Sequence, residues 1–205
     1  MSAIALRMID GVHERYVVER RVRVIAHHLS RLVPQGSDVL DVGAGAGTIA
    51  LSLMRQRPDI RVRGIDVLVR PGTHIPVREF DGSRIPEADR SVDTILLVDV
   101  LHHTDDPVSL LREAARVARE AVVIKDHVLD GWLASQTLRF MDRTGNERHG
   151  VRLPYNYLTL QQWKVAFEDA GLRVDADVRR LGLYPPPASW VFDRQLHFAA
   201  RLVHC

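Results

Sequence analysis

The stretch that decides the fold is VLDVGAGAGTIAL, residues 39–51. An apolar run leads past Asp41 to three alternating glycines, Gly43, Gly45 and Gly47, and then to a helical segment. Glycine permits a positive φ and lets a ligand touch the backbone. The first turn of the helix that follows offers free N–H groups to a carboxylate or phosphate. This order indicates a ligand-binding turn, with a tight turn that binds nothing as the alternative.

A dinucleotide-binding loop is the nearest competing interpretation, and it needs the spacing G-x-G-x-x-G. Counted from Gly43, its third glycine falls at Thr48. Asp41 would also face the pyrophosphate of a dinucleotide, and like charges repel. A ligand with a cationic amino group suits this carboxylate better.

Outward from the loop, strands alternate with helices. Apolar or alternating runs predict strands at 38–42, 60–66, 76–80, 92–98 and 121–125, and two antiparallel strands near 172–181 and 194–203. Helices are predicted over 13–33, 48–57 and 106–119, the last capped by Asp106 with Pro107 behind it, and after the capping box at 159–162. This order predicts an α/β sandwich with a mostly parallel sheet.

Length and composition fit one soluble domain spanning residues 1–205. Hydrophobic residues make up 46% and charged residues 26%, and the net charge is +2. The single cysteine, Cys205, is the last residue, so an internal disulfide is excluded and a cytoplasmic setting fits best. No run approaches the 18 apolar residues of a membrane-spanning helix, so we expect no membrane partner.

The acidic-x-G-x-G-x-G pattern at Asp41, Gly43, Gly45 and Gly47 resembles the first motif of class I S-adenosylmethionine-dependent methyltransferases, in their small UbiE-like branch. The resemblance covers roughly residues 36–126, with a looser match to residue 205. It implies a three-layer sandwich with a Rossmann-like seven-stranded sheet whose last strand is antiparallel, plus a small cap. It also implies S-adenosyl-L-methionine as cofactor and a methyl acceptor that these motifs do not specify.

The resemblance also assigns roles to single residues. Asp66, at the end of the second strand, would bind the ribose hydroxyls, with a strand-end turn as the alternative. Asp81 would bind the adenine amino group, and Leu101 would pack near the methionine or adenine part. Asp99 would contact the cofactor or face solvent. The full set implied for the cofactor is Asp41, Gly43, Ala44, Gly45, Gly47, Asp66, Val67, Asp81, Gly82, Asp99 and Leu101.

Candidate catalytic residues follow the fourth and fifth strands, at the sheet edge where α/β proteins bind ligands. We expect His103 or His127, rather than His102, to serve as a base if the acceptor must lose a proton. Residues 127–158 break the strand–helix rhythm and predict a cap beside the acceptor. Within it, Trp132, Leu138 and Met141 are expected to form the core of a lid helix. Residues 1–35 predict an N-terminal helical lid.

Three further expectations concern ligands and partners. The adjacent histidines at 27–28 and 102–103 would diverge on a helix, so we expect no metal site. A small-molecule methyl acceptor is favoured over nucleic acid, because the net charge is near zero, and the oligomeric state is open. The alternatives are a non-catalytic cofactor-binding protein, and an RNA methyltransferase or RNA-binding module. The RNA alternative needs one basic face made by Arg20, Arg21, Arg23, Arg139, Arg143, Arg148 and Arg152.

Overall fold

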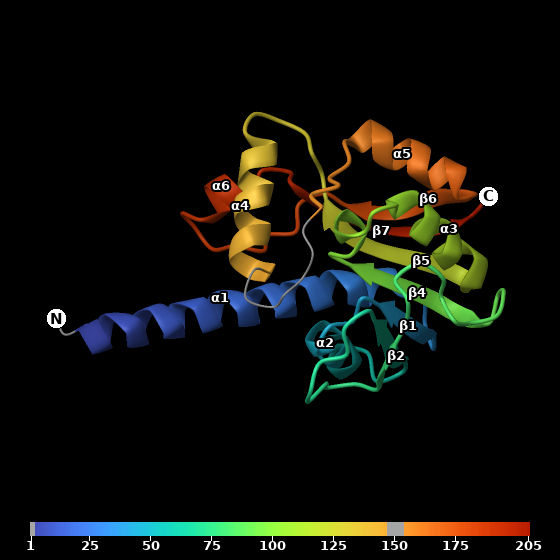
Figure 1. Cartoon of the computed structure of the whole chain (residues 1–205), viewed down its shortest axis with the longest axis horizontal. Coiled ribbons are helices and arrows are strands. Elements are labelled where there is room, and N and C mark those ends of the chain that lie inside the picture. Colours follow the sequence, from blue (N-terminus) through green and yellow to red (C-terminus); the bar gives the residue numbers. More distant parts are fainter. Residues whose placement is uncertain (1–2, 147–153) are drawn as a thin grey trace.

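The computed structural model describes residues 3–146 and 154–205, and seven strands in them form one sheet. The strands are β1 (Asp38–Val42), β2 (Arg61–Asp66), β3 (Val77–Glu79), β4 (Val92–Val98), β5 (Ala118–His127), β6 (Leu172–Val178) and β7 (His197–His204). Their order is β3-β2-β1-β4-β5-β7-β6 (Figure 1). β7 runs antiparallel to both of its neighbours, and the remaining pairs are parallel. The expected Rossmann-like sheet with an antiparallel last strand is confirmed.

Helices cover both faces of this sheet. They are α1 (Ala3–Leu32), α2 (Thr48–Gln56), α3 (Pro107–Val117), α4 (Ala134–Asn146), α5 (Leu160–Asp169) and α6 (Ser189–Phe192), and η1 (Leu101–His103) is a single 3-10 turn. One core layer contains Leu29 of α1 and Leu53 of α2. The other contains Leu111 of α3 and Phe167 of α5. Apolar stripes on the helices and apolar runs in the strands thus produce the three-layer sandwich.

Local signals fix the helix ends as expected. Asp106 accepts a hydrogen bond from the backbone N–H of Ser109, with Pro107 at the first helical position. Thr159 and Gln162 form the reciprocal capping box of α5. The strand predicted at 172–181 ends earlier, at Val178, because the backbone leaves its pairing with β7 there.

The cap is built around α4, which lies with α6 away from the sheet and close to α1 in Figure 1. Leu138 is buried in a small cluster with Ala134, Tyr157 and Leu196, and Met141 packs against it. Trp132 corrects the expectation of a lid core, because its side chain is 80% exposed. It lies in the turn before α4 and not on the face of the helix that Leu138 and Met141 share. Residues 147–153, which belong to the predicted cap, lie outside the described residues.

The chain order places a crevice at one edge of the sheet. β1 and β4 are neighbours, and the chain continues from β1 towards one side of the sheet and from β4 towards the other. In α/β folds, ligands bind at such a switch point, beyond the carboxyl ends of the strands. Within the described residues, no helix combines the length and the apolar character needed to cross a lipid bilayer.

Candidate functional site

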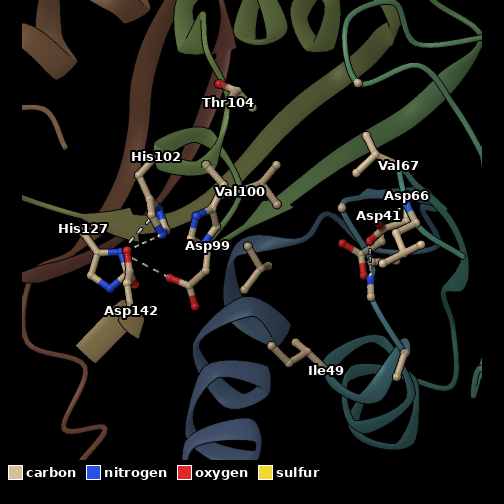
Figure 2. Close-up of a pocket in the computed structure, with 18 of the residues that line it drawn as sticks. Asp41, Ile49, Asp66, Val67, Asp99, Val100, His102, Thr104, His127 and Asp142 are labelled. Carbon is tan, nitrogen blue, oxygen red and sulfur yellow. Dashed lines mark hydrogen bonds and ion pairs between the residues drawn. The ribbon is translucent and has the colours of Figure 1, made fainter. Parts of the chain in front are cut away.

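The loops that follow β1, β2, β3 and β4, together with the last residue of β5, border one cavity of about 1120 Å³. In Figure 2, Asp41 and Asp66 lie on one side of this pocket, and His102, His127 and Asp142 lie on the other. α1 and α4 also border the pocket. They contribute Val17, Val18, Arg21 and Val22 from α1, and Phe140, Met141 and Asp142 from α4.

The glycine loop shapes the first side. Gly43 has φ 76°, and a Cβ built on it would lie only 2.5 Å from Val100 Cγ2. Gly45 differs, because a Cβ there would meet only the Arg70 side chain, 3.8 Å away. Its N–H donates to Asp66 Oδ2 at 2.7 Å. The loop therefore packs tightly behind Gly43 and leaves open space at Gly45, where a ligand can approach the backbone.

Asp41 is a buried carboxylate in this half, with 4% of its surface exposed. Burial, followed by the negative charge of Asp66, raises the pKa of Asp41 to about 7. Among the described residues no side chain or backbone N–H donates to it. A buried carboxylate without a donor is costly, so this position fits a cationic ligand group.

Asp66 and Asp81 are held by their own loops. Asp66 Oδ1 accepts from the N–H of Leu68 at 2.9 Å. Asp81 Oδ1 accepts from Ser83 N, Ser83 Oγ and Arg84 N, and these hydrogen bonds lower the pKa of Asp81. Both carboxylates border the pocket. The three hydrogen bonds to Asp81 all go to Oδ1, and Asp66 accepts one on each oxygen. Because a carboxylate has about four lone-pair sites over its two oxygens, both acids keep acceptor capacity for a ligand.

His102 lies at the centre of the other half and is almost fully buried. Its Nδ1 is 2.5 Å from Asp126 Oδ1, and its Nε2 is 3.5 Å from Asp142 Oδ2. Burial alone would lower the pKa of His102, but the charge and hydrogen bond of Asp126, followed by Asp142, raise it to about 10. Asp126 also accepts from the N–H groups of Leu101 and His127, which fixes its carboxylate against the sheet.

The two expected catalytic histidines both border the pocket. Burial, followed by the charge of His102, lowers the pKa of His103 to about 4. Burial, followed by the charge of Lys125, lowers the pKa of His127. His127 Nδ1 lies 3.4 Å from His102 Nδ1. Because both pKa values are lowered, the rings of His103 and His127 are neutral near pH 7.

A charged group at the ends of β4 and β5 holds Asp99. Lys125 Nζ and Arg21 donate to its two oxygens, Arg21 at 2.5 Å. Although burial would raise the pKa of Asp99, the charges of Lys125 and Arg21 keep it well below its usual range. Asp99 thus borders the pocket as a carboxylate whose two oxygens are already paired with Arg21 of α1 and Lys125 of β5, rather than facing solvent.

The cap contributes Asp142 and Tyr157. The Tyr157 hydroxyl donates to Asp142 Oδ2, and its ring stacks on His102 at 5.6 Å between centroids. Asn156 ties this segment to η1, because its backbone N–H donates to His102 O and its Nδ2 donates to Thr104 O. The segment before α5 thereby brings the cap to the histidines.

Most residues expected at the cofactor site border this pocket, and two do not. Leu101 is fully buried in the core under η1, so it packs beneath the pocket. Gly47 is the N-cap of α2 with φ 74°, and a Cβ on it would lie 2.5 Å from Ile75 Cγ1, so packing accounts for it. The remaining expected cofactor residues border the cavity: Asp41, Gly43, Ala44, Gly45, Asp66, Val67, Asp81, Gly82 and Asp99.

The expectation that His102 and His103 diverge is wrong. Their ring centroids are 4.0 Å apart, because η1 is a single turn and not part of a continuous helix. Sequence reasoning also missed Arg21, Lys125 and Asp142. For Lys125 a signal existed, since it follows an apolar run at the edge where Asp99 also lies.

The basic face required by the RNA alternative is only partly described. Arg21 is paired with Asp99 inside the pocket, and Arg20 donates to Gly182 O. Arg139 lies over the ring of Tyr155. Arg148 and Arg152 lie outside the described residues.

Comparison with protein families gives a match over most of the chain. A family model described as "Methyltransferase domain" matches residues 16–177. Ribosomal RNA small subunit methyltransferase G from Frankia alni is 40% identical over 68 residues, which is 33% of this chain. The match spans only 22% of that protein's length.

Solved structures of the same fold cover nearly the whole chain. A chain of the Haloferax volcanii complex between the Trm112 methyltransferase activator and a methyltransferase has a TM-score of 0.68 at 19% identity, covering 96% of this chain and 95% of its own. A SAM-dependent methyltransferase from Thermotoga maritima has a TM-score of 0.64 at 16% identity, covering 97% of both chains. One from Aquifex aeolicus has a TM-score of 0.59 at 21% identity, covering 87% of this chain and 88% of its own.

Proposed function

Because the chain belongs to the methyltransferase-domain family, we propose that it methylates a small organic acceptor bound beside the histidines of the pocket. The enzyme is a methyltransferase, and its cofactor is S-adenosylmethionine. One observation carries the choice of acceptor. The glycine loop and the histidine group border the same cavity of about 1120 Å³, slightly larger than the roughly 300–1,000 Å³ of a pocket for one small ligand, so it has room for a cofactor and a small acceptor together.

The residues of the first side fit the cofactor. Asp41, buried and without a donor, would hold its cationic amino group. Asp66 would accept the ribose hydroxyls, and Asp81 the adenine amino group. The open space at Gly45 would admit the ligand to the backbone. When bound, S-adenosylmethionine supplies a methyl group activated by the positive charge of its sulfur.

The protein's own contribution is to position the acceptor. Holding a nucleophile within reach of its target can lower a barrier by roughly 7–11 kcal/mol. His103 and His127 border the far side of the cavity, so both would contact the acceptor and orient its nucleophilic atom. Phe140 of α4 and Phe192 of α6, which also border the cavity and stack on each other, would exclude water on that side.

A small acceptor suits this geometry better than RNA. Arg21, one of the arginines that an RNA face would need, is used inside the pocket to hold Asp99. α1 and α4 border the cavity next to the histidines, so they limit the size of an acceptor that can bind there. A non-catalytic cofactor-binding protein would need no such space beyond its cofactor.

The test follows the label from the cofactor to its acceptor. The protein is incubated with tritiated S-adenosylmethionine and either a small-metabolite extract or total RNA. Label should enter the small-molecule fraction, and the Gly45→Val variant, whose side chain fills the open space in the loop, should transfer none. Label in RNA alone would overturn the choice of acceptor. Calorimetry with S-adenosylhomocysteine separately checks the cofactor, and heat with a nicotinamide dinucleotide instead would overturn the cofactor assignment.

A further inference from the structure

Three potential metal ligands converge where the cap meets η1. A nitrogen of His102, a nitrogen of His103 and a carboxylate oxygen of Asp142 all lie within 4.8 Å of one another. His102 Nε2 and Asp142 Oδ2 are 3.5 Å apart. Ligands bonded at about 2.0–2.2 Å to one ion stand roughly 3–3.5 Å apart, so only a small inward movement would be needed.

Two of these nitrogens have no other partner. His102 Nε2 and His103 Nδ1 are buried, and neither finds a hydrogen-bond partner among the described residues. The side chain of His102 is 1% exposed. Buried polar atoms are normally satisfied, so this pair needs an explanation. His102, His103 and Asp142 also border the pocket.

The neighbours of these side chains match the surroundings of a metal site. A metal-bound histidine usually donates its other ring N–H to a carboxylate, which fixes the ring and its tautomer. Here His102 Nδ1 lies 2.5 Å from Asp126 Oδ1, and Asp126 is itself held by two backbone N–H groups. Asp142 is oriented by the Tyr157 hydroxyl.

We propose that His102 Nε2, His103 Nδ1 and the Asp142 carboxylate bind one divalent first-row transition metal ion in the pocket. Imidazole nitrogens suit zinc, iron, cobalt and nickel, whereas sites for magnesium or calcium are built from oxygen ligands. Two histidines and one carboxylate leave coordination positions open for a ligand from the cavity that these residues border. The alternative is a proton: a protonated His102 between Asp126 and Asp142 would hold the same side chains together with no metal.

Such an ion would narrow the class of acceptor, and this step rests on the proposed function. An acceptor with a hydroxyl group, or with adjacent oxygen or nitrogen atoms, could bind at the open positions. A metal ion makes a bound hydroxyl more acidic, so the nucleophile would release its proton to solvent water before the methyl group leaves the sulfur for its oxygen, and no protein side chain would have to act as base. His103 would then act as a ligand, and His127 would remain to orient the acceptor.

The test measures metal binding directly. Tag-free protein is stripped with a chelator and dialysed, then titrated with cobalt(II) chloride, with zinc(II) chloride as a second probe. Calorimetry gives the stoichiometry, and the visible absorption of cobalt reports nitrogen ligands. The variants are His103→Gln and Asp142→Asn. The matched control is His197→Gln. His197 is a buried histidine whose ring contacts that of His127, and it belongs neither to the proposed ligands nor to the cavity lining. Binding of S-adenosylhomocysteine and the thermal unfolding midpoint verify that each variant is folded.

Wild type and the His197→Gln control should each bind one equivalent of metal. His103→Gln and Asp142→Asn should each weaken metal binding by more than about 100-fold. Replacing a residue that only supports a ligand typically weakens it by about 10–100-fold. Asp126→Asn should cost about 10–100-fold. The proposal is overturned if stripped wild type takes up no stoichiometric metal, or if both ligand variants retain wild-type affinity, which would mean binding at surface histidines only. Metal uptake without methylation of small acceptors would refute the proposed function and leave the site standing. Full methylation by stripped protein would refute the metal's role on the acceptor.

Discussion

Replacing Asp41 with asparagine should make the cofactor-free protein more stable and its cofactor binding weaker. Burial and the nearby charge of Asp66 raise the pKa of Asp41 from 3.8 to about 7. At about 1.4 kcal/mol for each tenfold change in the acid equilibrium, this corresponds to about 4 kcal/mol of destabilisation when the carboxylate is charged. Asparagine has nearly the same shape and carries no charge, so Asp41→Asn should recover at most that amount.

The effect should depend on pH with a definite sign. Between about pH 4 and 7 the folded chain keeps a proton on Asp41 that the unfolded chain has released. Stability from this group is therefore present at low pH and lost as the pH rises towards 7. The advantage of Asp41→Asn should be small at pH 4 and reach its full size by pH 8.

Cofactor binding should change in the opposite sense. A cationic amino group needs the ionised form of Asp41, so the wild-type affinity for S-adenosylhomocysteine should fall as the pH drops below 7. In the asparagine variant this dependence should disappear, and at pH 8 its affinity should be lower by roughly 1.5–3 kcal/mol, the usual worth of a hydrogen bond to a charged group.

The assays are urea unfolding at pH 4 and pH 8 and calorimetry with S-adenosylhomocysteine across the same range. Asp38→Asn is the matched control, because Asp38 begins the same strand at its opposite end and pairs with Arg63. It should leave the affinity and its pH dependence unchanged. If Asp41→Asn were less stable than wild type at pH 8, or bound the ligand equally well at every pH, the assignment of a charged, partnerless carboxylate would be refuted.

Four other substitutions separate structural from binding roles. Gly47→Ala should destabilise the fold by about 1–3 kcal/mol in urea unfolding, since its Cβ would lie 2.5 Å from Ile75 Cγ1. Gly45→Ala should cost only about 1 kcal/mol of left-handed backbone strain, yet lose most affinity for S-adenosylhomocysteine by calorimetry; equal affinity would contradict the loop assignment. Asp66→Ala should raise the dissociation constant by roughly 10–150-fold. Thr159→Ala should lower stability by about 1 kcal/mol through loss of the cap and leave binding unchanged.

The parts of the fold that the sequence predicts are those with local causes. The alternating glycines after an apolar strand, the cap at Asp106 and the capping box at Thr159 each depend on residues within four positions of one another. The strand ends were less predictable, because they depend on pairing between distant segments. β6, for example, ends where its pairing with β7 stops.

The two sides of the pocket also differ in how far local sequence predicts them. On the cofactor side, each candidate acid lies in or beside its own short loop, so a motif reveals it. On the other side, the ion group joins Arg21 of α1, Asp99 after β4 and Lys125 of β5. No spacing in the sequence connects these positions, and the link between His102 and Asp142 depends on how the cap folds back.

The proposed acceptor space and the cofactor side are built from partly different segments of the chain. The cofactor side depends on β1, β2 and the loop after β3, whereas the histidine side also depends on α1, α4 and the segment before α5. Changes in α4 can therefore reshape the proposed acceptor space without touching the glycine loop. Asp142 of α4 is the clearest example, since its side chain borders the cavity and also contacts His102 and Tyr157. A substitution there should alter what the pocket accepts while leaving the cofactor's affinity intact, which is how a specificity determinant differs from a structural residue.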